Sequence, residues 1–226
     1  ERIVKQLPTD RQTLLFSATL PPALNSMLGT ATTAPLVRPG YVVIDTIGEE
    51  EDAERAVVSV PQDGIVVPMD RQIVALDNII RDHVASCRAA NAKFKVIVFF
   101  AAARIAGFTA NIIEASQPGY KVLEIHSRMT QSKRTRTSDE FRDGSNVVLF
   151  SSDVSARGLD YPDVTLVVQC GLTERDSYIH RVGRTARAGR SGLGVLLASP
   201  FEERALKQRL RDLPIKWDTS ASASVA

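Results

Sequence analysis

Arginines recur at every third position near the carboxyl-terminal end of the sequence, at Arg181, Arg184, Arg187 and Arg190. On a helix, this spacing places like charges on one face, and each such pair destabilises the helix by about 0.2–0.5 kcal/mol. A guanidinium binds phosphate through two parallel hydrogen bonds, so the cluster becomes favourable beside a phosphate-rich partner. The stretch therefore indicates a site for phosphate groups. A solvated helix face paired with nearby carboxylates is the alternative.

A second polar stretch, "SSDVSARGLDYPDV" at 151–164, follows an apolar run and combines hydroxyls, an arginine, a glycine and carboxylates. A carboxylate after a glycine turn suits a ribose hydroxyl, and arginine with hydroxyl groups suits phosphates. An ordinary polar loop between a strand and a helix is the alternative interpretation.

The elements that must position these residues follow from the apolar pattern. Short runs rich in valine, isoleucine and leucine predict strands at 13–18, 41–45, 64–68, 95–100, 121–126, 146–152, 164–169 and 194–199. Helical patterns lie at 71–86, 102–116, 130–142, 174–187 and 201–213. Continuous apolar runs are typical of strands buried on both faces, and their alternation with helices predicts an α/β fold with a doubly wound, mostly parallel sheet. Ligands of such sheets bind at the carboxyl ends of the strands, where both polar stretches begin.

Domain organisation follows from an acidic stretch, "GEEEDAE" at 48–54, which lacks apolar periodicity and predicts a solvated linker over 48–56. Residues 1–47 hold two expected strands, too few to bury a core. We therefore expect residues 1–47 to be the tail of a preceding domain, residues 57–217 to form an independent domain, and residues 218–226 to be a disordered tail.

The composition is that of a soluble globular protein, because 44% of the 226 residues are hydrophobic and 24% are charged. The formal net charge is only +2, so any nucleic-acid site must be local. The two cysteines, Cys87 and Cys170, lie far apart and are expected to be reduced thiols of an intracellular protein. No apolar run approaches the roughly 20 residues of a membrane-spanning helix, so we expect no membrane partner. We also expect a monomer.

Three motifs carry a family resemblance: "SATL" at 17–20, "SARGLD" at 155–160 and "HRVGRTARAG" at 180–189. In order and spacing they resemble motifs III, V and VI of the DEAD-box RNA helicases. The resemblance implies two RecA-like domains joined by a hinge, with ATP and single-stranded RNA bound across the cleft between them. The chain would then hold the end of the first domain, over 1–47, and essentially all of the second.

A finer resemblance rests on "YVVIDTIGEEE" and "MTQSKRTRTSDEFRDG". These stretches are similar to the fungal mitochondrial branch of the family, which remodels structured RNAs. A mitochondrial location follows as an expectation, with the nucleus or cytoplasm as alternatives.

On the nucleotide side, the resemblance implies that Arg184 and Arg187 reach the γ-phosphate as catalytic residues. Gly158 and Asp160 would contact the ribose of ATP. His180 would act with Arg184 and Arg187 by coupling the arginine motif to motif III. Arg181 would be an organising ion-pair partner. The motif III residues in that interdomain coupling are Ser17 and Thr19.

On the RNA side, basic residues surround an expected helix start, where anions bind favourably. They are Arg128, Lys133, Arg134 and Arg136. By resemblance, Gln131 and Arg134 form the Gln-x-x-Arg element of the family, and Ser152 and Arg157 match motif V residues that touch the RNA backbone.

Two residues depart from the family pattern. Ala102 stands where a threonine is usual, which removes one hydroxyl contact to RNA. Ser127 stands where a glycine is usual, so a side chain is expected to crowd the approach of the backbone to RNA.

The chain contains neither a G-x-x-x-x-G-K-[ST] motif nor Asp-Glu-Ala-Asp. ATP and Mg²⁺ are therefore expected cofactors of the full-length protein, with the Mg²⁺ ligands in the missing first domain, and the fragment is expected to be inactive alone. One alternative is an RNA- or protein-binding module without an ATPase role, which would not require His180, Arg184 and Arg187 together. Another is a DNA-translocating or metabolic member of the RecA-like class, against which "ARGLD" argues.

Overall fold

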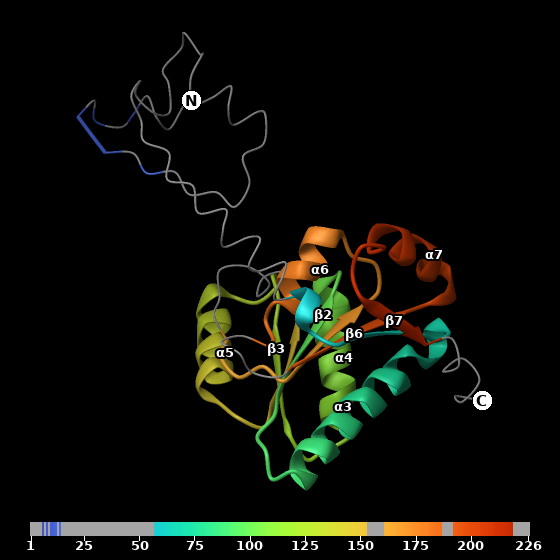
Figure 1. Cartoon of the computed structure of the whole chain (residues 1–226). Coiled ribbons are helices and arrows are strands. Elements are labelled where there is room, and N and C mark those ends of the chain that lie inside the picture. Colours follow the sequence, from blue (N-terminus) through green and yellow to red (C-terminus); the bar gives the residue numbers. More distant parts are fainter. Residues whose placement is uncertain are drawn as a thin grey trace. The chain divides into compact units, whose positions relative to one another are not determined.

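The computed structural model describes residues 57–152, 161–186 and 192–218, together with residues 6, 8, 10–12 and 14. The chain divides into two compact units, Glu1–Asp52 and Ala53–Ala226. The second unit contains a sheet of seven described strands in the order β3-β4-β2-β5-β6-β1-β7, and every neighbouring pair runs parallel (Figure 1). This is the expected doubly wound architecture, with no antiparallel strand among those described.

The strands are β1 (Gln62–Val66), β2 (Lys95–Phe100), β3 (Lys121–Ile125), β4 (Val147–Ser151), β5 (Leu166–Cys170), β6 (Leu193–Ala198) and β7 (Ile215–Asp218). The helices are the short 3₁₀ helix η2 (Met69–Arg71) and the α-helices α3 (Gln72–Ala89), α4 (Ala103–Ala115), α5 (Gln131–Asp143), α6 (Arg175–Val182) and α7 (Pro200–Arg209). A strand–helix alternation of this kind requires crossover connections, which is why every strand pair is parallel.

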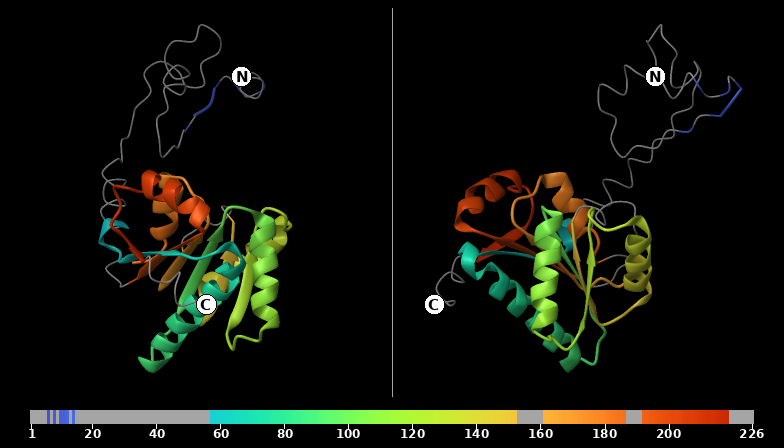
Figure 2. Two further views of the ribbon diagram at one scale, coloured as in Figure 1. Left: turned by 90° about the vertical axis from the view of Figure 1, so that its right-hand side faces the viewer. Right: turned by 180° about the vertical axis from the view of Figure 1, so that it is seen from behind.

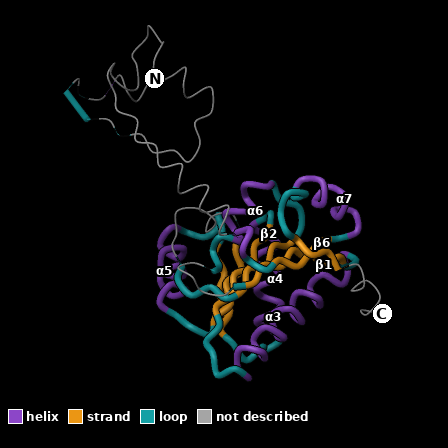
Figure 3. Tube along the Cα trace, in the orientation of Figure 1, coloured by secondary structure: helices purple, strands orange, loops and turns teal. Residues whose placement is uncertain are grey.

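Helices cover both faces of the sheet, as Figures 2 and 3 show. Helices α3 and α4 pack against one face, where residues such as Val96, Val98 and Phe100 of β2 are buried. The alternate residues Ile97 and Phe99 point to the other face, where α5 closes a second core cluster. Helices α6 and α7 close a third cluster on the same face. All six residues of β2 are buried, which explains its continuous apolar sequence.

Local signals begin the helices that flank the site. Thr130 is the N-cap of α5, and its hydroxyl accepts a hydrogen bond from the Lys133 backbone N–H at 3.3 Å. Helix α7 begins with a capping box between Ser199 and Glu202, and Pro200 occupies its first turn.

Helix α6 is shorter than the expected 174–187, because it ends at Val182. After it, Arg184 N–H and Thr185 N–H donate to carbonyls three residues back, at 3.0 Å each, which tightens the chain into a turn. Ala186 then adopts a left-handed backbone conformation with φ +56°, which no α-helix can continue. The expectation that the arginines share one helix face was therefore wrong: of Arg181 and Arg184, only Arg181 lies on the helix.

Strand β7 was not predicted from the sequence. It is a four-residue edge strand of half-buried and exposed residues, so it lacks the apolar run that marks the central strands. Asp218, expected to begin a tail, is its last residue. The strands expected at 13–18 and 41–45 lie outside the described residues apart from Leu14, and the linker expected at 48–56 lies wholly outside them. In the part of the chain that is described, no helix is long and apolar enough to cross a membrane.

Candidate functional site

The candidate residues follow the carboxyl ends of neighbouring parallel strands. The register pairs Phe99 of β2 and Ile125 of β3 with Ser151 of β4, and Phe100 with Cys170 of β5. The loops that leave these ends hold Ala102, His126, Ser127, Arg128 and Ser152, and the loop after β5 leads into α6. The described RNA candidates Arg128, Gln131, Arg134 and Ser152 therefore lie near one edge of the sheet, as expected for a ligand site in this architecture. Arg184 lies beyond the far end of α6, on the face of the sheet that α5 also covers.

Arg181 is buried inside the domain, with a relative exposure of 3%. Its guanidinium donates hydrogen bonds to Gln169 Oε1 and to Thr173 Oγ1, the latter at 3.2 Å, and lies 5.5 Å from the ring centroid of Phe99. Gln169 Nε2 in turn donates to the Cys170 and Gly171 carbonyls, at 3.0 and 3.3 Å. These contacts tie α6 to the end of β5, so Arg181 organises the motif rather than reaching for a ligand.

Arg184 follows the helix and is 8% exposed. Its Nε donates to the His180 carbonyl at 3.2 Å, and His180 itself is half-buried in the last turn of α6. The neighbouring Thr185 hydroxyl donates to the Val164 carbonyl at 2.5 Å. The side chain of Arg184 is therefore held by its backbone surroundings before any ligand arrives, which is the preorganisation that a phosphate-binding arginine needs.

Gln131 and Arg134 form a hydrogen-bonded pair at the start of α5, where the Arg134 guanidinium donates to Gln131 Oε1. Arg134 Nε is buried and has no hydrogen-bond partner among the described residues. A buried guanidinium N–H without a partner is destabilising, so this pair is poised to donate to an acceptor from outside the described residues. The structure thus brings together the two residues predicted to contact RNA.

Ser152 and Arg128 complete the described part of the predicted RNA surface. Arg128 is exposed in the turn between β3 and α5. Ser152 is 6% exposed, and its backbone N–H donates to the Ile125 carbonyl at 3.3 Å. Contact between Ser152 and RNA therefore depends on its hydroxyl.

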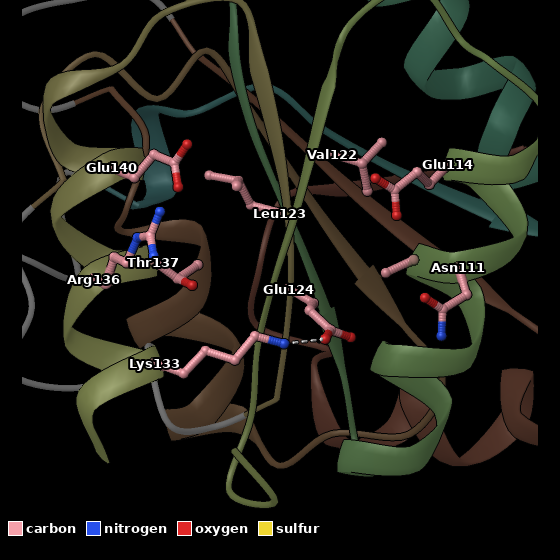
Figure 4. A pocket seen from close by; sticks show the side chains of 10 residues that line it. Asn111, Glu114, Val122, Leu123, Glu124, Lys133, Arg136, Thr137 and Glu140 are labelled. Atoms are coloured by element: carbon pink, nitrogen blue, oxygen red, sulfur yellow. Dashed lines mark hydrogen bonds and ion pairs between the residues drawn. The ribbon is translucent and has the colours of Figure 1, made fainter. Parts of the chain in front are cut away.

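The other two residues of the predicted basic cluster on α5 lie apart from this pair. Lys133 and Arg136 line a groove of about 290 Å³ between α4 and α5, over the outer edge of β3 (Figure 4). The Lys133 ammonium pairs with Glu124 Oε1 at 3.1 Å, as the dashed line in Figure 4 shows. Lys133 is thus paired within the domain, although its side chain remains 58% exposed.

The two departures from the family pattern cause no backbone strain. Ala102 is the N-cap of α4 with extended dihedrals, and it offers no side-chain acceptor to the first turn. Ser127 is exposed and is not among the residues with positive φ, so the chain does not require a glycine there.

Several predicted site residues lie outside the described residues. They are Ser17, Thr19, Arg157, Gly158, Asp160 and Arg187. Their roles stay predictions.

Sequence reasoning missed three residues that support the site. Gln169 is fully buried at the end of an apolar strand, and a polar residue in such a run was the available signal. Tyr161 is fully buried beside α5. A Cβ added to Gly192 would lie 2.0 Å from Thr185 Oγ1, so a glycine is needed beside the arginine loop, which is the turn at 183–186 that follows α6. The contacts of Tyr161 and Gly192 are non-local, and no sequence pattern marks them.

Metal ligands and thiols add nothing to the site. Among the described residues, no group of three or more His, Cys, Asp or Glu side chains could hold a metal ion. Cys87 and Cys170 are both free thiols, and burial raises the pKa of Cys170, which keeps it protonated.

Comparison with known proteins agrees with this geometry. The family model described as the helicase conserved C-terminal domain matches residues 73–189, just over half of the chain. "DEAD-box ATP-dependent RNA helicase 31" of Oryza sativa subsp. japonica is 44% identical over 216 residues, covering 95% of this chain. The chain spans only 37% of that protein's length.

Two solved structures are similar as well. "Mss116p DEAD-box helicase domain 2 bound to an RNA duplex" has a TM-score of 0.60 and 30% identity, covering 70% of this chain and 63% of that one. "DEAD-box helicase Mss116 bound to ssRNA and UDP-BeF" has a TM-score of 0.63 and 28% identity, covering 70% of this chain and 32% of that one.

Curated relatives at 37–44% identity include proteins of rice and Arabidopsis thaliana. The resemblance to a fungal mitochondrial branch is therefore not supported by these relatives. The family itself is supported by the sequence motifs, by the all-parallel fold and by the matched model. The chain belongs to the helicase conserved C-terminal domain family, and it is similar over most of its length to part of proteins named DEAD-box ATP-dependent RNA helicases.

Proposed function

We propose that the full-length protein is an ATP-dependent RNA helicase that couples ATP binding and hydrolysis to RNA binding, local unwinding and remodelling. One observation carries the proposal: the preorganised Arg184 at the end of α6 and the Gln131–Arg134 pair at the start of α5 belong to helices that cover the same face of one sheet. An arginine held for a phosphate and a guanidinium with an unused donor are the two halves of such a coupled site.

On the nucleotide side, Arg184 and Arg187 act on the γ-phosphate of ATP, and Gly158 and Asp160 contact its ribose. Mg²⁺, when bound, neutralises charge on the phosphates, and its ligands belong to the first RecA-like domain. The proposal that this chain works with a nucleotide is supported by the similar structure described as bound to UDP-BeF.

On the RNA side, Arg128, Gln131, Arg134, Ser152 and Arg157 contact the sugar–phosphate backbone. Such contacts provide affinity and discriminate RNA from DNA through the 2′-hydroxyl, while they read little base sequence. Similar structures described as bound to an RNA duplex and to single-stranded RNA support this assignment.

Coupling between the domains runs through His180, which responds to Ser17 and Thr19 of motif III, while Arg181 holds α6 in place. Closure of the first RecA-like domain over this one brings the arginines to ATP, so the chain alone is inactive. The protein acts as a monomer. A steady-state assay that finds RNA-stimulated ATP hydrolysis by the 226-residue chain would contradict the proposal that hydrolysis needs both domains.

The compartment is a separate proposal. A mitochondrial, intracellular location rests on the two stretches that resemble the fungal mitochondrial branch, and the plant relatives do not support that branch. Imaging of the full-length protein with a C-terminal fluorescent fusion tests the location, and a nuclear or cytoplasmic signal would reject it.

The decisive experiment compares single-turnover ATP hydrolysis by the full-length protein and its variants. Arg184→Ala should slow hydrolysis by about 10³-fold or more, because an arginine finger contributes about 10³–10⁵ in rate. Arg184→Lys should rescue poorly, since an ammonium cannot form the bidentate fork. Arg204→Ala, an exposed arginine of α7, is the matched control and should hydrolyse normally.

A binding module without an ATPase role is the second candidate, favoured by the three core clusters that this domain closes by itself. In that case Arg134→Ala would weaken RNA binding, while Arg184→Ala would change neither hydrolysis nor the effect of ATP on RNA affinity. Normal thermal melting of Arg184→Ala with wild-type hydrolysis would select this candidate.

A further inference from the structure

Tyr161 lies between α5, which carries the proposed RNA contacts, and the arginine loop, which holds Arg184 of the proposed nucleotide site. It is fully buried, and its hydroxyl is hydrogen-bonded to the Ser138 hydroxyl of α5 at 3.1 Å. Ser138 is itself 5% exposed. The ring of Tyr161 meets the Phe141 ring edge to face, with centroids 4.9 Å apart. Both contacts fix Tyr161 to the buried face of α5.

Ser138 connects directly to the predicted RNA contacts along the helix. Arg134 precedes Ser138 by four residues, so the two side chains lie one turn apart on the same side of α5. Arg134 is paired with Gln131 one turn earlier. A ligand that draws Arg134 outward therefore acts on the turn of helix that holds Ser138.

The other end of the Tyr161 segment is attached to the arginine loop. Val164, three residues after Tyr161, accepts the hydrogen bond of the Thr185 hydroxyl through its carbonyl at 2.5 Å. Thr185 is 3% exposed and directly follows Arg184. Gly192 packs against Thr185 so closely that a Cβ would lie 2.0 Å from its Oγ1, which leaves the loop little room to shift. The segment 161–164 thus touches α5 on one side and the arginine loop on the other.

Charge and burial fit this placement. Burial raises the pKa of the Tyr161 hydroxyl, and the Ser138 hydrogen bond together with the charges of Arg142 and Arg184 opposes the rise. The hydroxyl therefore stays protonated and can keep its hydrogen bond. The positive charge of Arg184 acts on the same hydroxyl.

A second path joins the same regions. Phe99, Phe141 and Tyr161 belong to one core cluster, and Arg181 lies over the Phe99 ring. The core beneath α5 is thereby continuous with the helix that carries the arginine motif. A densely packed cluster of this kind transmits small shifts, because it is not compressible.

We infer that the Tyr161–Ser138 hydrogen bond is a positioning contact that couples occupancy of the RNA site on α5 to the placement of the Arg184 loop. The inference rests on the proposed function. Tyr161 touches neither ligand, and acts through Val164 and Thr185 on one side and through Ser138 on the other.

The test measures single-stranded RNA affinity of the full-length protein with and without a non-hydrolysable ATP analogue. The ratio of the two affinities is the coupling between the sites. Tyr161→Phe and Ser138→Ala each remove the hydrogen bond, and each should lower the ratio by about two- to tenfold, the range for one buried hydrogen bond. The double variant should lower it no further, because both changes remove the same contact.

Tyr120→Phe is the matched control. The Tyr120 hydroxyl is also buried but has no hydrogen-bond partner among the described residues, and its ring packs on Phe94 beside β3. This variant should keep the wild-type ratio.

Three results would overturn the inference. Variants that melt at lower temperature but keep the wild-type ratio would show a merely structural contact. Additive effects in the double variant would show that the two hydroxyls act separately. If the wild-type protein binds RNA equally well with and without the ATP analogue, the ratio is one and the proposed function itself is refuted. If the wild-type ratio is high and both substitutions leave it unchanged, only the coupling contact is refuted. If Tyr161→Phe fails to fold, Ser138→Ala decides alone, because it leaves the ring packing in place.

Discussion

At the scale of single residues, polar side chains inside the domain hold Arg181 in place. Arg181 is one of the few charged side chains that the described core encloses, and Gln169 and Thr173 accept its hydrogen bonds. A buried charge is tolerated only where its hydrogen bonds are made. The motif is therefore supported from inside the domain, and Arg184, the next arginine along the chain, is the one that we propose meets the phosphate.

Gln169→Leu tests this support. The substitution keeps the volume of the side chain and removes the acceptor of Arg181, so we expect the free energy of unfolding to fall by about 1.5–3 kcal/mol. Urea denaturation of the 226-residue chain measures the change. Gln131→Leu, at an exposed position, should stay within about 0.5 kcal/mol of wild type. Equal effects of the two substitutions would show that Arg181 does not need Gln169.

His83 on α3 is a second residue whose burial has a measurable consequence. Its Nε2 lies 2.8 Å from Thr165 Oγ1 and 3.6 Å from Cys87 Sγ, and burial lowers the pKa of the imidazole below the ordinary value of 6.5. The unfolded chain then binds a proton at a higher pH than the folded chain does. Protonation favours unfolding, so this residue contributes a loss of stability as the pH falls below about 7.

His83→Gln should remove that contribution, because glutamine does not titrate. The drop in unfolding free energy between pH 7.5 and pH 5.5 should be smaller in the variant than in the wild type, as measured by urea denaturation at each pH. Between pH 7.5 and pH 8.5 the imidazole is neutral in both states, so the two proteins should change in parallel. If the unfolding free energy of the variant falls between pH 7.5 and pH 5.5 as much as that of the wild type, His83 is not the source of this pH dependence.

At the scale of elements, β7 shows how a short edge strand is fixed by packing. Trp217 of β7 lies over Gly64 of β1, where an added Cβ would come 2.6 Å from Trp217 Cε3. The Lys207 ammonium of α7 lies 5.2 Å from the centroid of the same indole. A tryptophan in this place lets four residues of β7 join the sheet without an apolar run of their own.

Gly64→Ala should therefore destabilise the domain by about 1–3 kcal/mol, because the indole and the edge strand must shift. Thermal or urea unfolding measures the change. Gly194→Ala, on neighbouring β6, is the control, since its Cβ would meet no atom closer than 3.3 Å. In a Trp217→Leu background the cost of Gly64→Ala should shrink, and an undiminished cost there would show that the clash is not with the indole.

At the scale of the whole domain, three core clusters and one sheet place the two candidate ligand regions on α5 and at the end of α6, which cover the same face of the sheet. The strands run parallel, so their carboxyl ends meet, and residues far apart in sequence reach one surface. Net charge is small, so the RNA binding that we propose would depend on a local group of basic residues, which includes Arg128 and Arg134 among those described.

Single-stranded RNA should therefore bind the 226-residue chain weakly and in a salt-sensitive way. Arg134→Ala should reduce the slope of log affinity against log salt by about 0.7, the value for one phosphate contact on single strands. Arg142→Ala removes the same charge from the other end of α5, where Arg142 pairs with Asp139, and should leave the slope unchanged. Fluorescence anisotropy over a salt series measures both, and equal slopes for wild type and Arg134→Ala would place the RNA surface elsewhere.

The sequence by itself determined the architecture and the family. Continuous apolar runs predicted β2 at its observed bounds, and β4 and β5 within two residues, because strands buried on both faces need apolar residues at every position. The motif at 180–189 predicted a role for Arg184 that stays a prediction, and the Gln-x-x-Arg element pointed to a pair that the structure shows to be hydrogen-bonded. These features are local in the chain, so their patterns can be read from it.

Only the tertiary structure decided which groups are engaged and which are available. Lys133 and Arg134 are adjacent basic residues, yet one pairs with Glu124 of β3 and the other keeps a buried N–H without a described partner. Arg181 and Arg184 share one motif, but Gln169 and Thr173 enclose the first, while the second lies beyond the end of α6. Tyr161 meets Ser138 only because the sheet brings the two segments together. Burial and pairing depend on residues distant in sequence, and the order of the parallel strands sets which of them meet.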